Sequence, residues 1–224
     1  MKDVKILLEQ LKITPHNLEN YELAMTHSSK NGDRNIRHHD YERLEFIGDA
    51  VIGLVVAELA FTKRGDLSQG MMSKMRSQLV NTQALSKHAR RLYLDQYIVL
   101  GNSLNGTVTD HILEDVFEAF TGAIYLDQGF SVAHDYLEDK FVNEVVHFDI
   151  GKVRDYKSAL QEAMQAEHRQ AIRYEAKVEG PSHAPMYLVE VIYGETILGR
   201  GKGTTKKAAE QEAAKDALKK MAKV

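Results

Sequence analysis

Hydrophobic residues recur at helical spacing through the first two-thirds of this 224-residue chain. Aliphatic residues over 44–59 repeat three or four positions apart, as they do on one face of an amphipathic helix. The same period predicts further helices over 109–126 and 131–146, whereas Gly101–Gly106 and Asp127–Gly129 are expected to be loops. The first part of the chain is therefore predicted to be all-α.

The pattern changes toward the C-terminus. A helix is predicted over 155–167, and alternating segments over 173–179, 186–193 and 195–201 are typical of strands. A segment rich in glycine and proline separates the first two strands. An Ala- and Lys-rich stretch over 206–221 follows two threonines that can cap a helix. The order α-β-β-β-α predicts a small α+β module.

The charge of the chain is divided unevenly between these two parts. From Val153 onward there are 13 Lys and Arg against 10 Asp and Glu, a net charge of +3, whereas the preceding residues have 16 against 22, a net charge of −6. Random surface charge would also explain this asymmetry, but it is consistent with two domains that have different tasks. We place their boundaries at 1–147 and 154–224, with a linker over 148–153.

Two groups of acidic residues are the candidates for chemistry. Glu42, Glu45 and Asp49 fall within one helix stripe, and Asp115 and Glu118 share one face of a later helix. Like charges stacked in this way repel unless they are solvated or a cation neutralises them. A ligand set of hard oxygens favours Mg²⁺ or Mn²⁺, and two such ions can hydrolyse a phosphodiester.

Other interpretations of the acidic groups remain open at this point. Acidic pairs three residues apart are often simply solvated, although here they lie beside strongly apolar stripes. Gly48 also interrupts the first helix, where glycine costs about 1 kcal/mol relative to alanine and permits close backbone packing. A di-iron bundle would need Glu-x-x-His pairs, which neither group contains. The segment His38-His39-Asp40 is expected to lie on the surface.

The sequence excludes several further classes of site. The chain has no cysteine, which rules out disulfides, thiolate zinc sites and a cysteine nucleophile. Its N-terminus carries charges throughout, unlike a secretory signal, and the apolar run over 50–61 is too short to span a bilayer. We expect a cytoplasmic protein with no membrane partner and no small-molecule cofactor.

Three segments of the first part resemble the ribonuclease III family. The family signature is similar to Glu42-Arg-Leu-Glu-Phe-Ile-Gly-Asp-Ala-Val. An upstream element resembles Leu23-Ala-Met-Thr-His-Ser, and a downstream acidic helix resembles the run from Ile112 to Asp127. The second part resembles a double-stranded-RNA-binding domain. The resemblance implies a multidomain chain in which an all-α catalytic and dimerisation domain precedes an α+β RNA-binding domain.

The resemblance also implies roles for individual residues. Glu42 would be an accessory residue near the subunit interface of a homodimer, and Phe46 would enter a cavity of the partner subunit. A buried core phenylalanine is the alternative for Phe46. The metal ligands, which are also the catalytic residues, would be Glu45, Asp49, Asp115 and Glu118.

One position departs from the family pattern. Gln69 stands where the family usually has glutamate, at a position that we group with the dimer interface. Glutamine keeps the shape and the hydrogen-bonding capacity of glutamate but loses its charge. Because the position is accessory, we expect the metal ligands to function and the efficiency of cleavage to change.

Three patches of the second domain are expected to contact RNA. Gln161 and Glu162 would meet one minor groove, and His183 in the loop between the first two strands would meet the next. Lys206 and Lys207 stand at a helix N-terminus, where the helix dipole disfavours lysine unless an anion such as phosphate is bound. Recognition of this kind reads the shape of the duplex over about 16 base pairs and little of its sequence.

The implied activity is metal-dependent cleavage of double-stranded RNA by water. Products would have 5′-phosphates, 3′-hydroxyls and two-nucleotide 3′ overhangs, in the processing of ribosomal or messenger RNA. Mg²⁺ would be the cofactor, and Mn²⁺ could substitute. The main alternative is a non-catalytic scaffold that binds double-stranded RNA, and a di-iron oxidoreductase is a weaker one.

Overall fold

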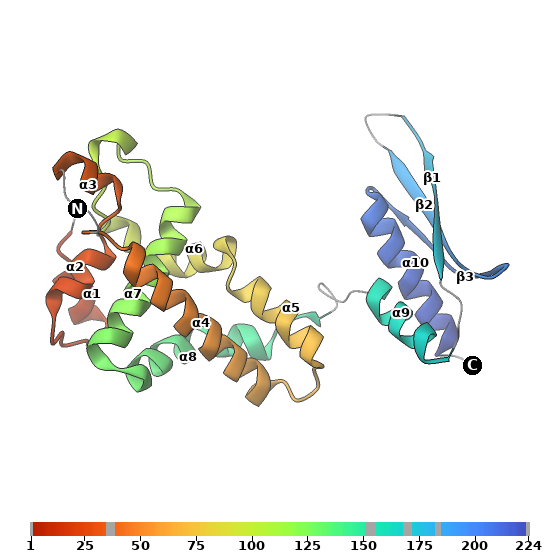
Figure 1. Cartoon of the computed structure of the whole chain (residues 1–224), viewed down its shortest axis with the longest axis horizontal. Helices are drawn as coiled ribbons and strands as arrows, with labels where there is room; N and C mark the ends of the chain where they lie inside the picture. The colour runs from red at the N-terminus through yellow and green to blue at the C-terminus, as the bar shows by residue number, and fades with distance from the viewer. Residues whose placement is uncertain (1, 35–38, 151–155, 168–171, 182–184, 223–224) are drawn as a thin grey trace. The chain divides into compact units, whose positions relative to one another are not determined.

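The computed structural model describes residues 2–34, 39–150, 156–167, 172–181 and 185–222. These residues form two compact units, Met1–Val153 and Arg154–Val224, and each is described by itself (Figure 1). No helix in the described ranges has both the length and the apolar character that crossing a membrane requires.

The first unit is helical, as predicted. Side chains of Asn17, Ser68, Asn81 and Thr109 accept hydrogen bonds from the first turns of the helices that follow them, which explains where these helices begin. The helices are α1 (Val4–Gln10), α2 (Leu18–Ala24), α3 (Ser29–Arg34), α4 (Glu42–Lys63), α5 (Gln69–Leu79), α6 (Thr82–Arg91), α7 (Asp110–Gln128) and α8 (Phe130–Val146), with 3₁₀ turns η1 (Leu94–Gln96) and η2 (Asn102–Leu104).

Two expected loops differ from the prediction. The segment Gly101–Gly106 contains η2, and α7 continues through Asp127 and Gln128 before Gly129, at φ +86°, separates it from α8. Tertiary contacts favour the longer helix, because the Asp127 carboxylate accepts hydrogen bonds from the Tyr21 hydroxyl and from two backbone N–H groups just before α2.

Helices α4 and α7 cross at the centre of the first unit (Figure 1). Gly48 of α4 faces the backbone of α7 so closely that a Cβ there would lie 1.8 Å from the Glu118 carbonyl oxygen. Gly122 of α7 faces α4 in the same way, with 2.2 Å between its hypothetical Cβ and the Leu44 carbonyl oxygen. The close backbone packing expected at Gly48 is therefore confirmed, and it sets the crossing of the two helices that carry the acidic residues.

The second unit has the predicted order α-β-β-β-α. It comprises α9 (Tyr156–Glu167), β1 (Arg173–Glu179), β2 (Met186–Tyr193), β3 (Thr196–Gly203) and α10 (Lys206–Met221). The strands form one antiparallel sheet in the order β1-β2-β3. Leu160 and Met164 of α9 share a small core with Val189 and Val191 of β2 and with alanines of α10.

Glycines also set the packing of α10 on the sheet. Gly199, Gly201 and Gly203 of β3 face α10, and a Cβ on Gly201 would lie 2.2 Å from the Ala209 carbonyl oxygen. The Thr205 hydroxyl accepts a hydrogen bond from the Ala208 N–H at 3.1 Å and caps α10, as its sequence position predicts. This close packing fixes the start of α10, where the two lysines lie.

Candidate metal centre and nucleic-acid surface

The crossing of α4 and α7 brings acidic side chains from both helices together. Glu45 of α4 and Asp115 and Glu118 of α7 each offer a carboxylate oxygen, and these three oxygens lie within 4.8 Å of one another. Residues seventy positions apart in the chain meet here because Gly48 and Gly122 allow the two backbones to approach. We refer to Glu45, Asp115 and Glu118 as the carboxylate cluster.

Two of the five acidic residues lie outside this cluster. Glu42 and Asp49 are exposed on α4, one turn before and one turn after Glu45. Their charges nevertheless reach the cluster, because Asp49 raises the pKa of Glu118 and both residues raise the pKa of Glu45.

Burial and mutual repulsion perturb the protonation of the cluster. Glu118 is 8% exposed, and burial followed by the charge of Asp49 raises its pKa to about 8. Burial followed by the charge of Asp115 raises the pKa of Glu45 to about 7. Three close carboxylates, partly removed from water, fit a hard divalent cation, which would neutralise them and accept only oxygen ligands.

Two neighbours of the cluster, Tyr41 and Glu114, were not indicated by the sequence pattern. The Tyr41 hydroxyl donates a hydrogen bond to Asp115 Oδ2 at 2.9 Å, and burial followed by the Asp115 charge raises the pKa of this tyrosine. Glu114 raises the pKa of both Glu45 and Glu118. Tyr41 lies four residues before Glu45, so helical spacing alone could have indicated that it approaches the same face.

A second group of possible metal ligands occurs on α8, where His134, Asp135 and Glu138 offer atoms within 4.8 Å of one another. Here the Asp135 side chain is 79% exposed, and Glu138 already pairs with Lys63 at 3.4 Å. A solvated acid and a competing ammonium group make this set a poorer cation site than the carboxylate cluster.

The structure corrects one alternative for Phe46 and one expectation for Asp40. Phe46 is 81% exposed within the chain, so it is not a core phenylalanine. Asp40 is 5% exposed rather than on the surface, because its carboxylate accepts hydrogen bonds from Asn31 and from the Glu42 N–H, which begins α4. Gln69, at the start of α5, donates a hydrogen bond to the Ser73 hydroxyl at 3.2 Å.

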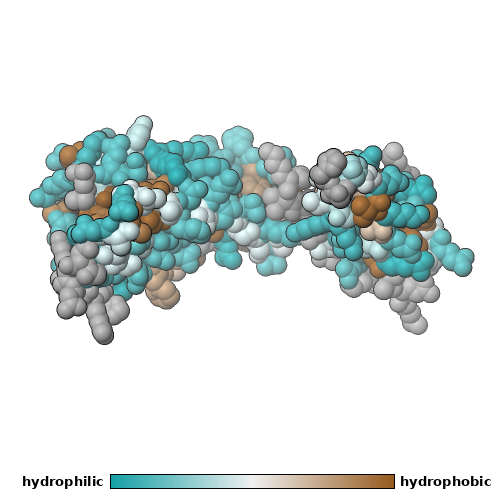
Figure 2. Space-filling model, turned by 90° about the horizontal axis from the view of Figure 1, so that it is seen from above, coloured by the Kyte–Doolittle hydropathy of each residue, from teal (hydrophilic) through white to brown (hydrophobic). Residues whose placement is uncertain are grey.

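Hydrophobic side chains are exposed on both units, although the face seen in Figure 2 is mostly hydrophilic. On α4 the exposed ones are Phe46, Leu54 and Phe61, at 81%, 56% and 74%. Their spacing of seven and eight residues places them on one side of the helix. This stripe is unlike the opposite side of α4, which is buried in the core.

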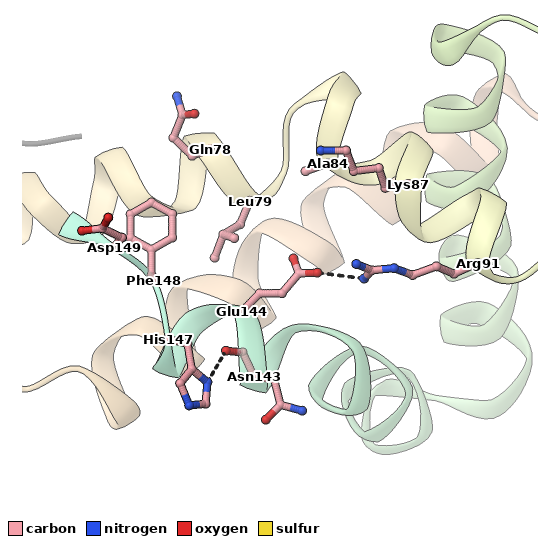
Figure 3. Close-up of a pocket in the computed structure, with 10 residues that line it drawn as sticks. All are labelled: Gln78, Leu79, Ala84, Lys87, Arg91, Asn143, Glu144, His147, Phe148 and Asp149. Atoms are coloured by element: carbon pink, nitrogen blue, oxygen red, sulfur yellow. Dashed lines mark hydrogen bonds and ion pairs between the residues drawn. The ribbon is translucent and has the colours of Figure 1, made fainter. Parts of the chain in front are cut away.

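A pocket of about 580 Å³ lies away from the carboxylate cluster, between α5, α6 and the end of α8 (Figure 3). Arg91 of α6 pairs with Glu144 of α8 at 2.8 Å within it, and Lys87 and His147 contribute to its lining. Among the described residues, the groups that could hold a metal ion do not include any that line this pocket, so the acidic site is the better candidate for chemistry.

The described part of the second unit exposes most of the expected RNA-binding residues. Gln161 on α9 and Lys206 and Lys207 at the start of α10 are exposed. His183 and the side chain of Glu162 lie outside the described residues. The two lysines follow the Thr205 cap directly, so their charges stand beside the N-terminal N–H groups of α10.

Comparisons with known proteins agree with both units. A family model described as Ribonuclease-III-like matches residues 17–145, and one described as Double-stranded RNA binding motif matches residues 156–221. Ribonuclease 3 of Onion yellows phytoplasma (strain OY-M) is 38% identical over 229 residues, covering 100% of this chain and 93% of that protein. Ribonuclease 3 of Streptococcus mutans is 40% identical over 224 residues, covering 97% and 96%.

A solved structure extends the agreement to three dimensions. The nuclease domain of ribonuclease III from Campylobacter jejuni aligns with a TM-score of 0.57 and 32% identity, covering 63% of this chain and 97% of that one. A helical unit with an acidic centre, followed by an RNA-binding unit, defines an endoribonuclease that acts on double-stranded RNA. The chain belongs to the ribonuclease III family.

Proposed function

We propose that the chain cleaves double-stranded RNA as a Mg²⁺-dependent homodimer, with Mn²⁺ as a substitute. The metal ligands in this proposal are Glu45, Asp49, Asp115 and Glu118, bound directly or through water. The observation that carries the proposal is the carboxylate cluster, in which three acidic oxygens lie within 4.8 Å at a crossing held by glycines. Asp49 extends the site, because its charge acts on Glu118.

The residues of the chain have separable tasks in this mechanism. Bound divalent cations would activate a water for attack on the phosphodiester and stabilise the departing 3′-oxygen. Glu45, Asp115 and Glu118 supply the negative charge that holds the cations, and Glu118 does so from a buried position. Without cations the cluster repels the RNA backbone, so productive docking and catalysis depend on the same neutralisation. The expected products have 5′-phosphate and 3′-hydroxyl ends with two-nucleotide 3′ overhangs.

The proposed dimer uses the exposed side of α4. Phe46, Leu54 and Phe61 form an apolar stripe there, and Glu42 lies beside Phe46. The aligned Campylobacter jejuni nuclease domain is described as having structural flexibility in a region involved in dimer formation. Burial of the stripe against a second copy would remove it from water and place one acidic site in each subunit, with Gln69 also at the interface.

The second unit would hold the duplex. Gln161, Glu162 and His183 would meet the minor grooves, while Lys206 and Lys207 would bind phosphates at the start of α10. We assign residues 1–147 to catalysis and dimerisation, 148–153 to the linker and 154–224 to RNA binding. We also propose a cytoplasmic role in the processing of ribosomal and messenger RNA.

The proposal is tested by incubating labelled duplex RNA with the full chain, with and without Mg²⁺. Cleavage should require Mg²⁺ or Mn²⁺, and Glu118→Gln should reduce it by about 10³-fold, because several kcal/mol of transition-state stabilisation are lost. Duplex binding by this variant should persist. The matched control is Glu9→Gln, an exposed acid on α1, which should cut at the wild-type rate.

The same assay separates the nuclease from a scaffold. Binding of the duplex without shortening, at ample Mg²⁺ and Mn²⁺, would show that the chain is a non-catalytic RNA binder. Loss of duplex binding in Glu118→Gln would show instead that the carboxylate cluster belongs to the binding surface.

A further inference from the structure

A tyrosine outside the acidic set contacts the carboxylate cluster directly. Tyr41 is 3% exposed and lies just before α4, and its hydroxyl donates to Asp115 Oδ2 at 2.9 Å. The χ2 angle of an aspartate has a broad distribution, so the plane of an isolated carboxylate can rotate freely. A hydrogen bond to one oxygen restricts that plane and leaves the other oxygen free to bind a cation.

The position of Tyr41 is itself fixed by the upstream Thr26-His27-Ser28-Ser29 segment. The Tyr41 N–H donates to the Thr26 carbonyl at 2.9 Å, and the His27 ring meets the Tyr41 ring edge-on, with 5.5 Å between centroids. Thr26, His27 and Ser28 belong to the upstream element that resembles a family motif, yet no residue of this segment belongs to the carboxylate cluster.

The segment is anchored in turn to the chain near residue 100. The His27 N–H donates to the Val99 carbonyl at 3.0 Å, and the Gly101 N–H donates to the Ser29 hydroxyl at 2.8 Å. The Ser29 N–H donates to Nδ1 of His27 at 2.9 Å, which orients the imidazole against Tyr41. Gly101 is required here, because a Cβ on it would lie 2.3 Å from the Ser29 carbonyl oxygen.

We propose that Tyr41 is a positioning residue that holds Asp115 in the orientation needed to bind a divalent cation, and that the segment from Thr26 to Ser29 supports Tyr41. This inference rests on the proposed metal centre. Repulsion from Glu45 and Glu118 would turn an unrestrained Asp115 away from the cluster. The phenol opposes that rotation as a neutral donor, so it orients the ligand without adding a positive charge that would compete with the cation.

The test is direct measurement of Mn²⁺ binding to the full chain by calorimetry, without RNA. Tyr41→Phe keeps the ring that packs on His27 and removes only the hydroxyl. Loss of such a supporting hydrogen bond is expected to raise the Kd for Mn²⁺ about tenfold or more. Circular dichroism checks that the variant is folded.

The chain offers a matched control for this variant. Tyr21 is fully buried and its hydroxyl donates to Asp127 Oδ2 at 2.8 Å, an arrangement of the same kind away from the carboxylate cluster. Tyr21→Phe loses an equivalent hydrogen bond and should leave the Kd for Mn²⁺ within twofold of the wild-type value. His27→Ala provides a second variant, which keeps the Tyr41 hydroxyl but removes its support, and should raise the Kd by a smaller factor.

Cleavage at varied Mn²⁺ gives a second readout. Tyr41→Phe should raise the Mn²⁺ concentration for half-maximal cleavage, and saturating Mn²⁺ should restore most of the rate. A Kd for Tyr41→Phe within twofold of wild type, or equal shifts in Tyr41→Phe and Tyr21→Phe, would overturn the positioning role while leaving the proposed function intact. A wild-type chain that neither binds Mn²⁺ nor cleaves RNA would overturn both.

Discussion

In both units of this chain, glycines allow close backbone packing, but the side chains that this packing positions are acidic in the first unit and basic in the second. In the first, Gly48 and Gly122 let α4 and α7 cross closely, and the crossing concentrates partly buried carboxylates. In the second, Gly201 and its neighbours let α10 pack closely on β3, and the start of that helix presents exposed lysines. Close packing therefore brings carboxylates together in one unit and positions exposed lysines in the other.

The two units differ in how much their functional charges destabilise the folded state. The carboxylates of the first unit are partly buried and repel one another. Their charges therefore destabilise the folded state unless a cation neutralises them. The lysines of the second unit are solvated, so their charges cost the folded state little. Function and stability should consequently be coupled through metal in the nuclease unit, and be nearly independent in the RNA-binding unit.

The largest expected effect comes from filling the α4–α7 crossing. Gly48→Ala would place a Cβ 1.8 Å from the Glu118 carbonyl oxygen, so the helices must separate. We expect a loss of about 3 kcal/mol in the unfolding free energy of the first unit, measured in urea, together with loss of cleavage.

Gly70→Ala is the matched control, because a Cβ on Gly70 in α5 meets nothing within 4 Å. It should change the unfolding free energy by less than about 1 kcal/mol. If Gly48→Ala kept the stability and activity of the wild type, the claim that the close crossing of α4 and α7 brings the carboxylates together would be wrong.

The next effect is the pH dependence of stability without metal. Because the folded state raises the carboxyl pKa of Glu118 to about 8 and that of Glu45 to about 7, it favours their protonated forms. Their contribution is fully present below the unfolded pKa, near 4.5, and is lost as pH rises through about 7 to 8. Metal-free stability should therefore fall by several kcal/mol between pH 5 and pH 8.5, since each unit of pKa shift corresponds to about 1.4 kcal/mol.

Thermal melts with and without Mg²⁺ check this linkage. Mg²⁺ should raise Tm more at pH 8.5 than at pH 5.5, because binding requires deprotonated ligands. Glu118→Gln should flatten the metal-free profile and reduce the Mg²⁺ effect. Equal Mg²⁺ shifts at both pH values would contradict the assignment of the raised pKa values to the metal centre.

A smaller effect is expected from the lysines at the start of α10. Replacing Lys206 and Lys207 with alanine should weaken duplex binding about tenfold at physiological salt and lower the slope of log K against log salt by nearly two. Tm should stay close to the wild-type value. The binding assay is run without divalent metal, so that cleavage does not interfere.

The matched control uses the other end of the same helix. Lys219 and Lys220 are also adjacent and exposed, but they lie in the last turn of α10. Their replacement by alanine should leave the salt slope near that of the wild type. Equal losses from the two pairs would indicate a general electrostatic effect rather than a phosphate site at the helix start.

The smallest effect is expected at Gln69. Gln69→Glu restores the charge usual in the family and should raise the cleavage rate a few-fold. The effect is small because an accessory position should change the activation free energy by about 1 kcal/mol or less. The Kd for Mn²⁺ should not change. Comparable cleavage rates for the two proteins would show that the missing charge has no catalytic consequence.

Much of the fold was accessible from the sequence because it depends on local periodicity. The helices near α4, α7 and α8 and the order of the second unit follow from apolar spacing, strand alternation and the Thr205 cap. The end of α7 was mispredicted, because long-range hydrogen bonds from Tyr21 and the segment before α2 hold Asp127 within the helix. Hydrogen bonds between residues far apart in the chain cannot be predicted from the local spacing of hydrophobic residues.

The candidate site divides in the same way. Helical spacing determined that Asp115 and Glu118 share a face and that Glu45 belongs to an acidic stripe, since the angle between residues on one helix is fixed. Only the tertiary structure decided which acids of the two helices meet, that Tyr41 contacts Asp115, and that Phe46 is exposed. These outcomes depend on how two helices cross, and that crossing is set by backbone contacts between residues far apart in the chain.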